Sequence, residues 1–422
     1  MKIKKLHFTP RIIRLTSFII ISWTALGTIL MLVFPFPQLI SLLALFIVIS
    51  PLLVFASSIC MVPIERLIVK GYYVNAKRKL SKYKPSIIGI TGSCGKTSVK
   101  NYLYDLIKEK HIVYKSPKSY NTLNGISMTI NEYLFSYNNL FILEMGATKV
   151  GDIEKLVNFA RPKYAVVTEI VPQHLETFKT TENIVYEKMK IVEGLPSDGV
   201  AFLNYDNEYI KNYQIKNSCK VITYGTNPNC DFYASNINMT LDKLTFDLHF
   251  QGLSYQIETK LLGRHNVLNL LAAISVANTI GLSIEEIIDA INDLNQVSHR
   301  LNLRYDRELI ILDDAYNSNV KGFLSALEVL SLSSEYKTLL TPGIVELGDK
   351  AKEISFELAK EIVKVCDEVI LIENDAAKYL QESLESLNYK NIRVAKSFKE
   401  GYALVKKGIV LIENDLTDNY FI

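Results

Sequence analysis

Residues 87–97 of this chain have the sequence Ile-Ile-Gly-Ile-Thr-Gly-Ser-Cys-Gly-Lys-Thr, which is its most informative segment. The apolar run 87–90 predicts a buried strand and residues 98–103 predict a helix, so a glycine-rich turn joins a strand to a helix. Small residues in such a turn let backbone N–H groups close around an anion, and the helix start adds its unsatisfied N–H groups and positive dipole end. The segment therefore predicts a phosphate-binding loop.

Individual side chains of this loop suit a nucleotide. Lys96 would reach the β- and γ-phosphates, and Thr97 would offer its hydroxyl to Mg²⁺. The strict pattern has a glycine six residues before the lysine, where this chain has Ile90. A chance glycine turn is the alternative interpretation, but the strand before it and the helix after it argue against chance. The predicted phosphate-binding residues are Thr91, Gly92, Ser93, Cys94, Gly95, Lys96, Thr97 and Ser98.

Composition indicates a folded chain with a basic N-terminal part. The chain has 422 residues, 49% of them hydrophobic, which is enough for two or three domains with a substantial core. Its five cysteines have no Cys-x-x-Cys spacing, so they indicate neither a disulfide framework nor a zinc site. Residues 1–84 carry twelve Lys or Arg and one acid, Glu65, whereas the rest carries 35 basic and 43 acidic residues. We expect this basic part to face a membrane, and we expect no nucleic-acid partner.

Two apolar segments near the N-terminus are long enough to cross a bilayer. No charged side chain occurs from residue 15 to residue 64, and Pro35 and Pro37 divide this run into segments 15–34 and 39–62. A span needs about 20 apolar residues, and the Lys and Arg residues on both flanks place both ends in the cytosol by the positive-inside rule. We therefore predict a protein of the inner (cytoplasmic) membrane with its catalytic domains in the cytoplasm.

Two other interpretations of these segments are a cleaved signal peptide and a buried hairpin in a soluble core. A second span follows the first at once, and no small-residue cleavage site separates them. A run of 50 uncharged residues also exceeds what helices of soluble proteins usually show. Both alternatives are weaker than a membrane hairpin.

Beyond residue 85 the pattern alternates short β-branched or aromatic runs with helical periods, which predicts an α/β fold with a mainly parallel sheet. Residues 231–259 instead alternate apolar and polar positions, which predicts a small antiparallel sheet beside the main one. A second α/β block begins near His299, with the size of one doubly wound domain. The predicted organisation is a membrane anchor over 1–84 with two transmembrane helices and a basic linker, a central nucleotide-binding domain over 85–298 and a Rossmann-like C-terminal domain over 299–422.

Three residues between the loop and residue 190 are candidates for metal chemistry. Glu144 ends an apolar strand, so its carboxylate would lie beside the nucleotide crevice and could bind Mg²⁺; a helix-capping acid is the alternative. His174 also follows a strand and is a second candidate ligand, or a loop residue with a local hydrogen bond. Lys188 lies in a helical pattern, and its residue type alone favours a solvated surface position.

Two later segments are candidates for nucleotide contacts. Residues 263–269, Gly-Arg-His-Asn-Val-Leu-Asn, open a helix, and the Arg and His there could meet an anion or a base. Residues 313–319, Asp-Asp-Ala-Tyr-Asn-Ser-Asn, follow the first strand of the last domain, where an acid commonly binds ribose hydroxyls or orients a lysine. Each segment is ambiguous by itself.

Taken together, these segments resemble the Mur ligases, the ATP-dependent amide-forming enzymes of peptidoglycan precursor synthesis, and among them the branch that adds D-alanyl-D-alanine. Their order and spacing hold from about residue 85 to residue 320. The similar segments are 91–97, 119–125, 144–147 with 151–153, 172–178, Lys188 with 193–195, 263–267 and 313–319.

The resemblance implies the P-loop Mur ligase fold and a mechanism with the cofactors ATP and Mg²⁺. ATP would phosphorylate a substrate carboxylate, and an amine would attack the acyl phosphate to give an amide, ADP and phosphate. Lys96, His174 and Lys188 are implied as catalytic residues, and Lys188 matches a lysine that the family carbamylates into a metal ligand. The implied metal ligands are Thr97, Glu144, His174 and Lys188, and the further implied ATP-binding residues are His265, Asn266, Asn269, Arg300 and Asp313.

Some segments depart from the family pattern. The apolar segments and basic linker stand where the family has a domain that binds a uridine nucleotide, and residues 411–420 lack its Lys-Gly-Ser-Arg signature. We expect a membrane-anchored ligase whose partners are a carboxylate-bearing envelope precursor, lipid-linked or polymeric, and an amino acid or dipeptide amine. Ordinary D-alanyl-D-alanine addition, poly-γ-glutamate-type or capsule-modifying ligation and a non-catalytic ATP-binding scaffold stay open.

Overall fold

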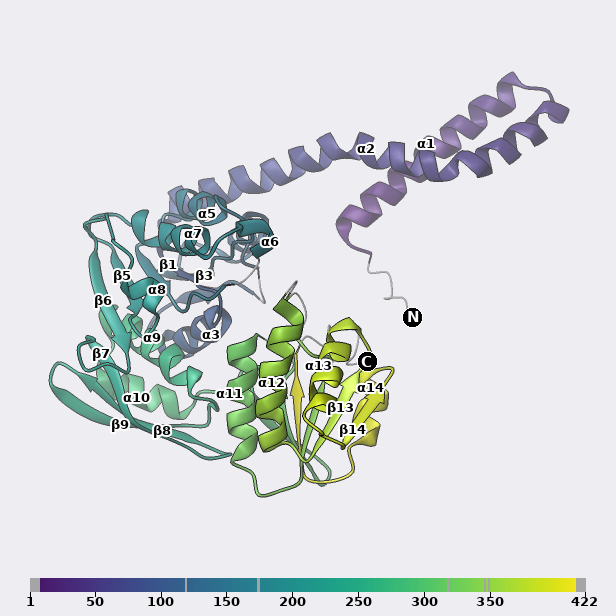
Figure 1. Ribbon diagram of the computed structural model, residues 1–422. Coiled ribbons are helices and arrows are strands. Elements are labelled where there is room, and N and C mark those ends of the chain that lie inside the picture. The colour runs from purple at the N-terminus through teal and green to yellow at the C-terminus, as the bar shows by residue number, and fades with distance from the viewer. Residues whose placement is uncertain are drawn as a thin grey trace. The chain divides into compact units, whose positions relative to one another are not determined.

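The computed structural model (Figure 1) describes residues 8–117, 120–172, 175–316, 319–344, 347 and 350–414. The side chains of residues 36–46, 175 and 176 are outside this description. The chain divides into two compact units, of which the first ends at Arg78 and the second begins at Lys79. The domain boundaries inferred from the sequence stay predictions.

The first unit consists of two apolar helices. Helix α1 (Pro10–Val33) begins after Thr9, whose Oγ1 accepts a hydrogen bond from the Ile12 N–H, and α2 spans Phe36–Tyr83. Both are long and apolar enough to be candidate membrane spans by length and composition. Arg14 Nε and Nη2 each lie 2.8 Å from a carboxylate oxygen of Glu65 in a two-pronged ion pair. Because these two residues flank the uncharged run, the pair ties together its two ends.

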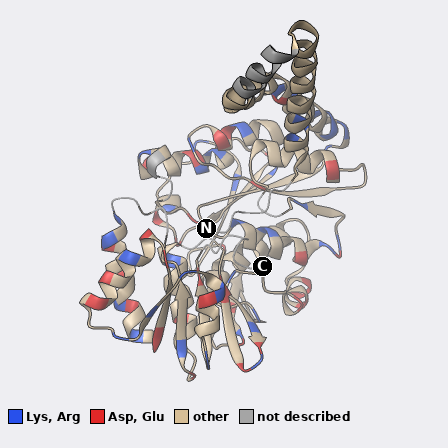
Figure 2. Cartoon of the chain, turned by 90° about the vertical axis from the view of Figure 1, so that its right-hand side faces the viewer, with Lys and Arg blue, Asp and Glu red and all other residues tan. Residues whose placement is uncertain are grey.

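Helix α2 continues through the segment that the sequence suggested as a linker. Pro51 and Pro63 lie inside it, and the helix ends only at Tyr83. Figure 2 shows Lys and Arg (blue) gathered on its later turns, whereas the described part of the apolar hairpin is largely tan. The basic linker is therefore helical.

The second unit contains a nine-stranded sheet with the order β2-β3-β1-β4-β5-β6-β7-β8-β9. The strands from β2 to β7 pair in parallel, and β7, β8 and β9 are antiparallel. Their bounds are β1 Ser86–Thr91, β2 Val113–Lys115, β3 Leu140–Glu144, β4 Tyr164–Val167, β5 Val200–Asn204, β6 Lys220–Gly225, β7 Phe232–Met239, β8 Leu244–Phe250 and β9 Leu253–Thr259.

The antiparallel strands expected in residues 231–259 are confirmed, but they do not form a small sheet of their own beside the main one. Tyr224 and Gly225 of β6 pair in parallel with Phe232 and Tyr233 of β7, so the antiparallel strands extend the same sheet. The alternation of apolar and polar residues indicates that one face of these strands is solvated. It does not indicate which other strand the edge strand pairs with. This pairing was therefore decided by tertiary contacts.

Helices cover both faces of this sheet (Figure 1). Helices α3 (Lys96–Ile107), α9 (His265–Thr279) and α10 (Ile284–Asn292) contribute to one buried apolar cluster with the strands. Helix α7 (Thr181–Glu193) contacts β1 and β4 and packs on α5 (Asp152–Ala160). The shorter elements are α4 Leu123–Tyr133, α6 Leu175–Phe178 and α8 Glu208–Lys211. The phosphate loop thus lies in a three-layered α/β arrangement.

A six-stranded sheet with the order β10-β11-β15-β12-β13-β14 follows, and all its pairs are parallel except β10 with β11. Its strands are β10 Asn302–Asp306, β11 Leu309–Asp314, β12 Lys337–Thr341, β13 Glu368–Ile372, β14 Ile392–Ala395 and β15 Ile409–Glu413. Its helices are α11 Val320–Ser331, α12 Ala351–Val365, α13 Asp375–Ser386 and α14 Phe398–Leu404.

Alternate residues of these strands face two separate cores. Leu312 of β11 packs with α11, α12 and α13, whereas its neighbour Ile311 packs with α14. This is the period of two that a strand buried on both faces requires. The expected strands β11 to β15 are confirmed; β10 was missed because its last three residues are exposed and its pattern is weak.

Candidate functional site

The phosphate loop lies between β1 and α3, as the sequence predicts. A Cβ atom on Gly92 would come within 2.0 Å of Thr168 Oγ1, and one on Gly95 within 2.4 Å of Asn269 Oδ1. Gly95 also has φ +81°, in the left-handed region, and caps the start of α3. The loop therefore keeps its backbone close to its neighbours only because both positions lack a side chain. Such a cradle fits a polyphosphate.

Lys96 folds back over the loop. Its Nζ donates hydrogen bonds to the carbonyl oxygens of Gly92, at 2.7 Å, and Ser93, at 3.0 Å. Burial lowers the pKa of Lys96, while the nearby charge of Glu144 opposes that change. The ammonium is thus held at the loop, where a bound phosphate would compete for it.

Glu144 lies at the carboxyl end of β3 and is nearly fully buried, with 2% exposure. Its Oε2 accepts hydrogen bonds from Thr97 Oγ1 at 3.0 Å and from Lys100 Nζ at 3.1 Å, and its Oε1 accepts one from Asn121 Nδ2 at 3.2 Å. Burial would raise the pKa of Glu144, but the charges of Lys100 and Lys96 and these hydrogen bonds outweigh burial and lower it. An ionised carboxylate beside a threonine hydroxyl is a donor set that fits Mg²⁺.

Lys188 of α7 is buried, with 5% exposure, so its residue type was misleading about its position. Its Nζ donates a hydrogen bond to the carbonyl of Gly92 at 3.0 Å. Burial, assisted by the positive charge of Lys96, lowers the pKa of Lys188 to about 7. The neighbouring Glu187 fixes this turn of the helix, because its carboxylate accepts from the backbone N–H groups of Gly151 and Ile153.

His174, the remaining predicted metal ligand, lies outside the described residues. Among the residues that the structure does describe, no group of three or more His, Cys, Asp or Glu side chains gathers to hold a metal ion. Of the four predicted metal ligands, Thr97, Glu144 and Lys188 lie within the described residues, and Lys188 would bind a metal ion only after its amine is modified.

A cavity of about 370 Å³ opens next to these groups. Three of its lining residues are the lysines Lys96, Lys155 and Lys188. Its acid Asp152 is already engaged, because one carboxylate oxygen accepts from the backbone N–H groups of Thr148 and Lys149. The remaining walls are partly apolar, with Leu123, Leu156, Phe178 and Ile184. A cavity with this charge suits a ligand that carries a carboxylate.

A second cavity of about 470 Å³ lies on the other side of the loop. Cys94, Gly95, Ser98 and Asn269 line it from the nine-stranded part, and Arg300, Asp314 and Tyr316 line it from the chain around β11. The Arg300 guanidinium lies 4.2 Å from the centre of the Tyr316 ring. The cavity thus presents a cation, an aromatic ring and amide groups beside the phosphate loop.

The residues at the start of α9 divide between the cavity and the core. His265 lines the cavity, and burial together with the charges of Arg300 and Lys321 lowers its pKa to about 4, so the imidazole is neutral at pH 7. Asn266 is buried, and its Oδ1 accepts from the Tyr102 hydroxyl at 2.9 Å and from Asn269 Nδ2 at 3.1 Å. Asn266 therefore holds α9 against α3.

The two adjacent acids at the end of β11 have different surroundings. Asp313 contacts His299 Nδ1 at 3.0 Å and Arg304 Nη2 at 3.3 Å. Asp314 lines the second cavity, accepts from the Leu301 N–H at 3.0 Å, and has a pKa that burial raises to about 7. Successive residues of a strand point to opposite faces, so only one of the two can face the cavity.

Sequence reasoning missed three residues of this region, Lys100, Glu169 and Lys321, and of the candidate segment 313–319 it named Asp313 rather than Asp314. Lys100 lies three residues after Thr97, and this helical spacing was a usable signal for a shared face. Glu169 and Lys321 are 152 residues apart in the chain but form an ion pair, which no local pattern indicates.

Comparison with known proteins shows what this chain is similar to. Residues 90–277 match the family model of the Mur ligase middle domain. The UDP-N-acetylmuramoyl-tripeptide–D-alanyl-D-alanine ligase of Escherichia coli (strain K12) is 31% identical over 269 residues, which cover 63% of this chain and 59% of that protein. The protein of the same name from Bacillus subtilis (strain 168) is 29% identical over 277 residues, 65% of this chain and 59% of that protein. The chain thus spans about three fifths of these relatives.

Solved structures of Mur ligases have a fold similar to that of this chain. The MurF ligase from Thermotoga maritima in complex with ADP is similar with a TM-score of 0.73 and 25% identity, covering 82% of this chain and 80% of that chain. MurF from Acinetobacter baumannii has a TM-score of 0.72 at 20% identity, covering 82% and 77%, and this likeness concerns the fold alone.

Proposed function

We propose that this chain, whose residues 90–277 match the Mur ligase middle domain and whose fold is that of the Mur ligases, is a membrane-anchored ATP-dependent ligase that joins a carboxylate of a cell-envelope precursor to an amine. The relatives are named for a UDP-N-acetylmuramoyl-tripeptide and D-alanyl-D-alanine. Because the chain spans only 59% of their length, its own substrates are part of the proposal.

ATP and Mg²⁺ fit the residues around the phosphate loop. The backbone of Gly92–Gly95 and the ammonium of Lys96 would hold the phosphates, and Thr97 with Glu144 would supply oxygen ligands to the metal ion. When bound, ATP would supply the phosphoryl group that activates the carboxylate, and attack by the amine would form the C–N bond and release phosphate. The chain itself would bind, orient and shield the reacting groups.

The observation that carries this proposal is the position of Lys188. The positive charge of a buried lysine has to be compensated by polar partners, or the amine has to be neutral. Lys188 is buried, and its Nζ lies 3.0 Å from the carbonyl of Gly92 in the phosphate loop. With a pKa of about 7, a large fraction of the amine is neutral at physiological pH. The neutral amine is the form that adds CO₂, and the resulting carbamate would turn a cation into an anionic metal ligand. A protein that merely binds nucleotide needs no such group.

The cavity of about 370 Å³ is the proposed site of the carboxylate substrate. Its lysines would attract the carboxylate, and Asn121 would help to orient it, since this side chain both lines the cavity and donates to Glu144. The acid would then lie on the same side of the loop as Lys188 and the proposed metal site. This arrangement favours phosphoryl transfer to the carboxylate over transfer to water.

The two apolar helices support a membrane-anchored form of the enzyme. An anchored enzyme meets a membrane-bound substrate at a raised effective concentration, so we propose a lipid-linked or polymeric precursor as the carboxylate donor. The catalytic part would face the cytoplasm, where ATP is available.

Phosphate release by the full-length chain in detergent tests this function. The purified protein would be screened with ATP and Mg²⁺ against amino acids and D-alanyl-D-alanine, with membrane extract or soluble UDP-muramoyl peptide as the carboxylate donor, and with Lys96→Ala as the inactive control. We expect release that depends on both the amine and the membrane extract. Full activity with the soluble donor after deletion of residues 1–64 would contradict a lipid-linked substrate. Unchanged cellular function of Lys188→Ala would favour the scaffold instead.

A further inference from the structure

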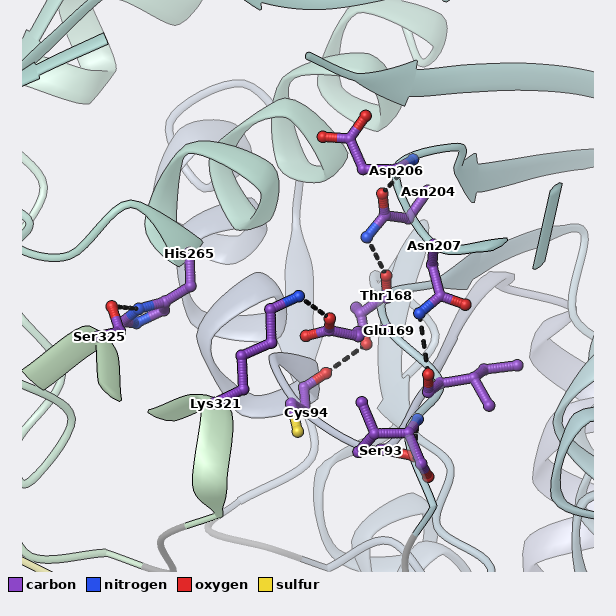
Figure 3. A network of polar contacts seen from close by, with 12 residues as sticks. Ser93, Cys94, Thr168, Glu169, Asn204, Asp206, Asn207, His265, Lys321 and Ser325 are labelled. Carbon is purple, nitrogen blue, oxygen red and sulfur yellow. Dashed lines mark hydrogen bonds and ion pairs between the residues drawn. The ribbon is translucent and has the colours of Figure 1, made fainter. Parts of the chain in front are cut away.

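Helix α11 carries a stripe of three polar residues that contact the nine-stranded part of the unit. Lys321, Ser325 and Glu328 are spaced four and three residues apart, so they lie on one helical face. Ser325 Oγ lies 3.0 Å from His265 Nδ1, Glu328 Oε1 lies 2.6 Å from Arg264 Nε, and Lys321 Nζ forms an ion pair with Glu169. Figure 3 shows the contacts of Ser325 and Lys321 side by side.

The partner of Lys321 is attached to the phosphate loop through the backbone. The carbonyl of Glu169 accepts a hydrogen bond from the Ser93 N–H, and Glu169 and Cys94 form an isolated β-bridge. The hydroxyl of Thr168 donates to the carbonyl of Cys94 (Figure 3). The backbone of Glu169 is therefore held beside the loop.

The two side chains of this ion pair differ in solvent exposure. The Glu169 side chain is 16% exposed, whereas the Lys321 side chain is 63% exposed. A lysine ammonium on its flexible stem can move by several ångströms, and an exposed ion pair contributes little to stability by itself. The pair is thus poorly suited to clamp two elements together, and Lys321 can exchange one anionic partner for another.

A second anionic partner for Lys321 would be a phosphate group held at the loop, because Lys321 lies beside it. Lys321 and Glu169 line the cavity of about 470 Å³ together with Cys94 and Gly95 of the phosphate loop. Asn319, at the start of α11, donates to Cys94 Sγ at 3.3 Å, which places this helix end against the loop. The charge of Glu169 acts to raise the pKa of the Cys94 thiol and the charge of Lys321 acts to lower it, so both side chains interact electrostatically with the loop.

We propose that Lys321 is a nucleotide-binding residue that exchanges partners: its ammonium pairs with Glu169 in the nucleotide-free protein and with the phosphates of a nucleotide held at the loop. This inference rests on the proposed nucleotide binding. In that role Glu169 competes with the nucleotide for Lys321, and it keeps the lysine near the cavity while the loop is free.

A double-mutant cycle on the full-length chain in detergent tests the exchange, with Mg²⁺-ADP binding measured by titration calorimetry at two salt concentrations. We expect Lys321→Met to weaken binding by roughly three- to tenfold and to reduce its salt dependence, and Lys321→Arg to restore most of the affinity. Glu169→Gln should strengthen binding by roughly two- to fivefold, because it frees the lysine. Glu169→Gln in the Lys321→Met background should change nothing.

Four other results would each overturn this expectation. If both single variants weaken binding, the pair is a structural clasp and the exchange is refuted. If the two effects simply add, Glu169 acts through long-range charge and the exchange is likewise refuted. If wild-type protein binds no ADP, the proposed function falls together with this inference, whereas binding that Lys321→Met leaves unchanged overturns the inference alone. Lys110→Met, which removes the exposed ion pair between Lys110, in the turn after α3, and Glu286 of α10, is the matched control and should bind as wild type.

Discussion

Lys100 Nζ lies 3.1 Å from Glu144 Oε2, and both side chains are 2% exposed. This buried ion pair keeps a carboxylate ionised at the carboxyl end of the sheet, next to the hydroxyl of Thr97. Without a cation nearby, burial would favour the protonated acid, which is a poor metal ligand. Lys100 would therefore keep Glu144 in the ionised form that the proposed metal site requires, without itself touching the metal.

Replacing Lys100 should be strongly destabilising. Lys100→Met leaves an uncompensated buried carboxylate, which costs about 3–5 kcal/mol. We expect the apparent melting temperature of the full-length chain in detergent to fall by about 5 °C or more. The matched control is Lys108→Met, which removes the exposed pair with Asp105 and should shift the melting temperature by about 1 °C or less. Equal shifts in the two variants would contradict the importance of burial.

The stability that Glu144 contributes should depend on pH. Its pKa lies below the ordinary value of 4.5, so its contribution is complete above pH 4.5 and is lost as the pH falls through the folded-state pKa. We expect the difference in melting temperature between wild type and Glu144→Gln to be constant from pH 5.5 to 7 and to shrink at lower pH. A difference that grows as the pH falls would show that the pKa is raised instead.

Lys188 should make stability rise with pH in a higher, alkaline range. Its folded-state pKa of about 7 lies below the ordinary 10.5, so the unfolded chain binds more protons between these values and stability rises with pH across them. In carbonate-free buffer this rise should amount to roughly 2–4 kcal/mol between pH 7 and 10. Thermal melts of Lys188→Met should lack it, while the exposed Lys149→Met should keep it. An unchanged rise in Lys188→Met would assign it to another group.

Two glycines with similar backbone angles allow the effect of backbone strain to be distinguished from the effect of a steric clash with a neighbouring side chain. Gly95 has φ +81° and Gly151 has φ +90°, but only a Cβ on Gly95 would meet a neighbour, Asn269 Oδ1 at 2.4 Å. Alanine at either position costs about 1 kcal/mol of backbone strain. Gly95→Ala should in addition weaken Mg²⁺-ADP binding by tenfold or more, measured by calorimetry, and Gly151→Ala should not. Unaltered ADP binding in Gly95→Ala would show that the loop tolerates a side chain and is not the cradle described.

Membrane attachment should depend on the first unit. We expect the full-length chain to stay in the membrane fraction after carbonate washing, and a chain lacking residues 1–64 to be released while it still binds Mg²⁺-ADP with similar affinity. Immunoblots of both fractions measure this outcome. A full-length chain that washes off would contradict the anchor.

Several features followed from local sequence patterns. The strand, glycine turn and helix around residue 92, the uncharged run from residue 15 to residue 64 and the five parallel strands of the last domain each depend on neighbouring residues, so they could be predicted. Glu144 was located by the same logic, because the end of a buried strand is visible in the sequence. The roles predicted for Lys96, His174 and the nucleotide-binding residues stay predictions.

The sequence by itself determined where backbone elements begin, which faces are apolar and where small residues allow a tight loop between a strand and a helix, because these properties depend on periods of two to four residues. Only the tertiary structure decided that Lys188 and Lys100 are buried, that Asp314 rather than Asp313 lines the cavity, and that Lys321 meets Glu169. The environment of a charged side chain depends on surfaces contributed by distant segments, and no local period records which surfaces those are.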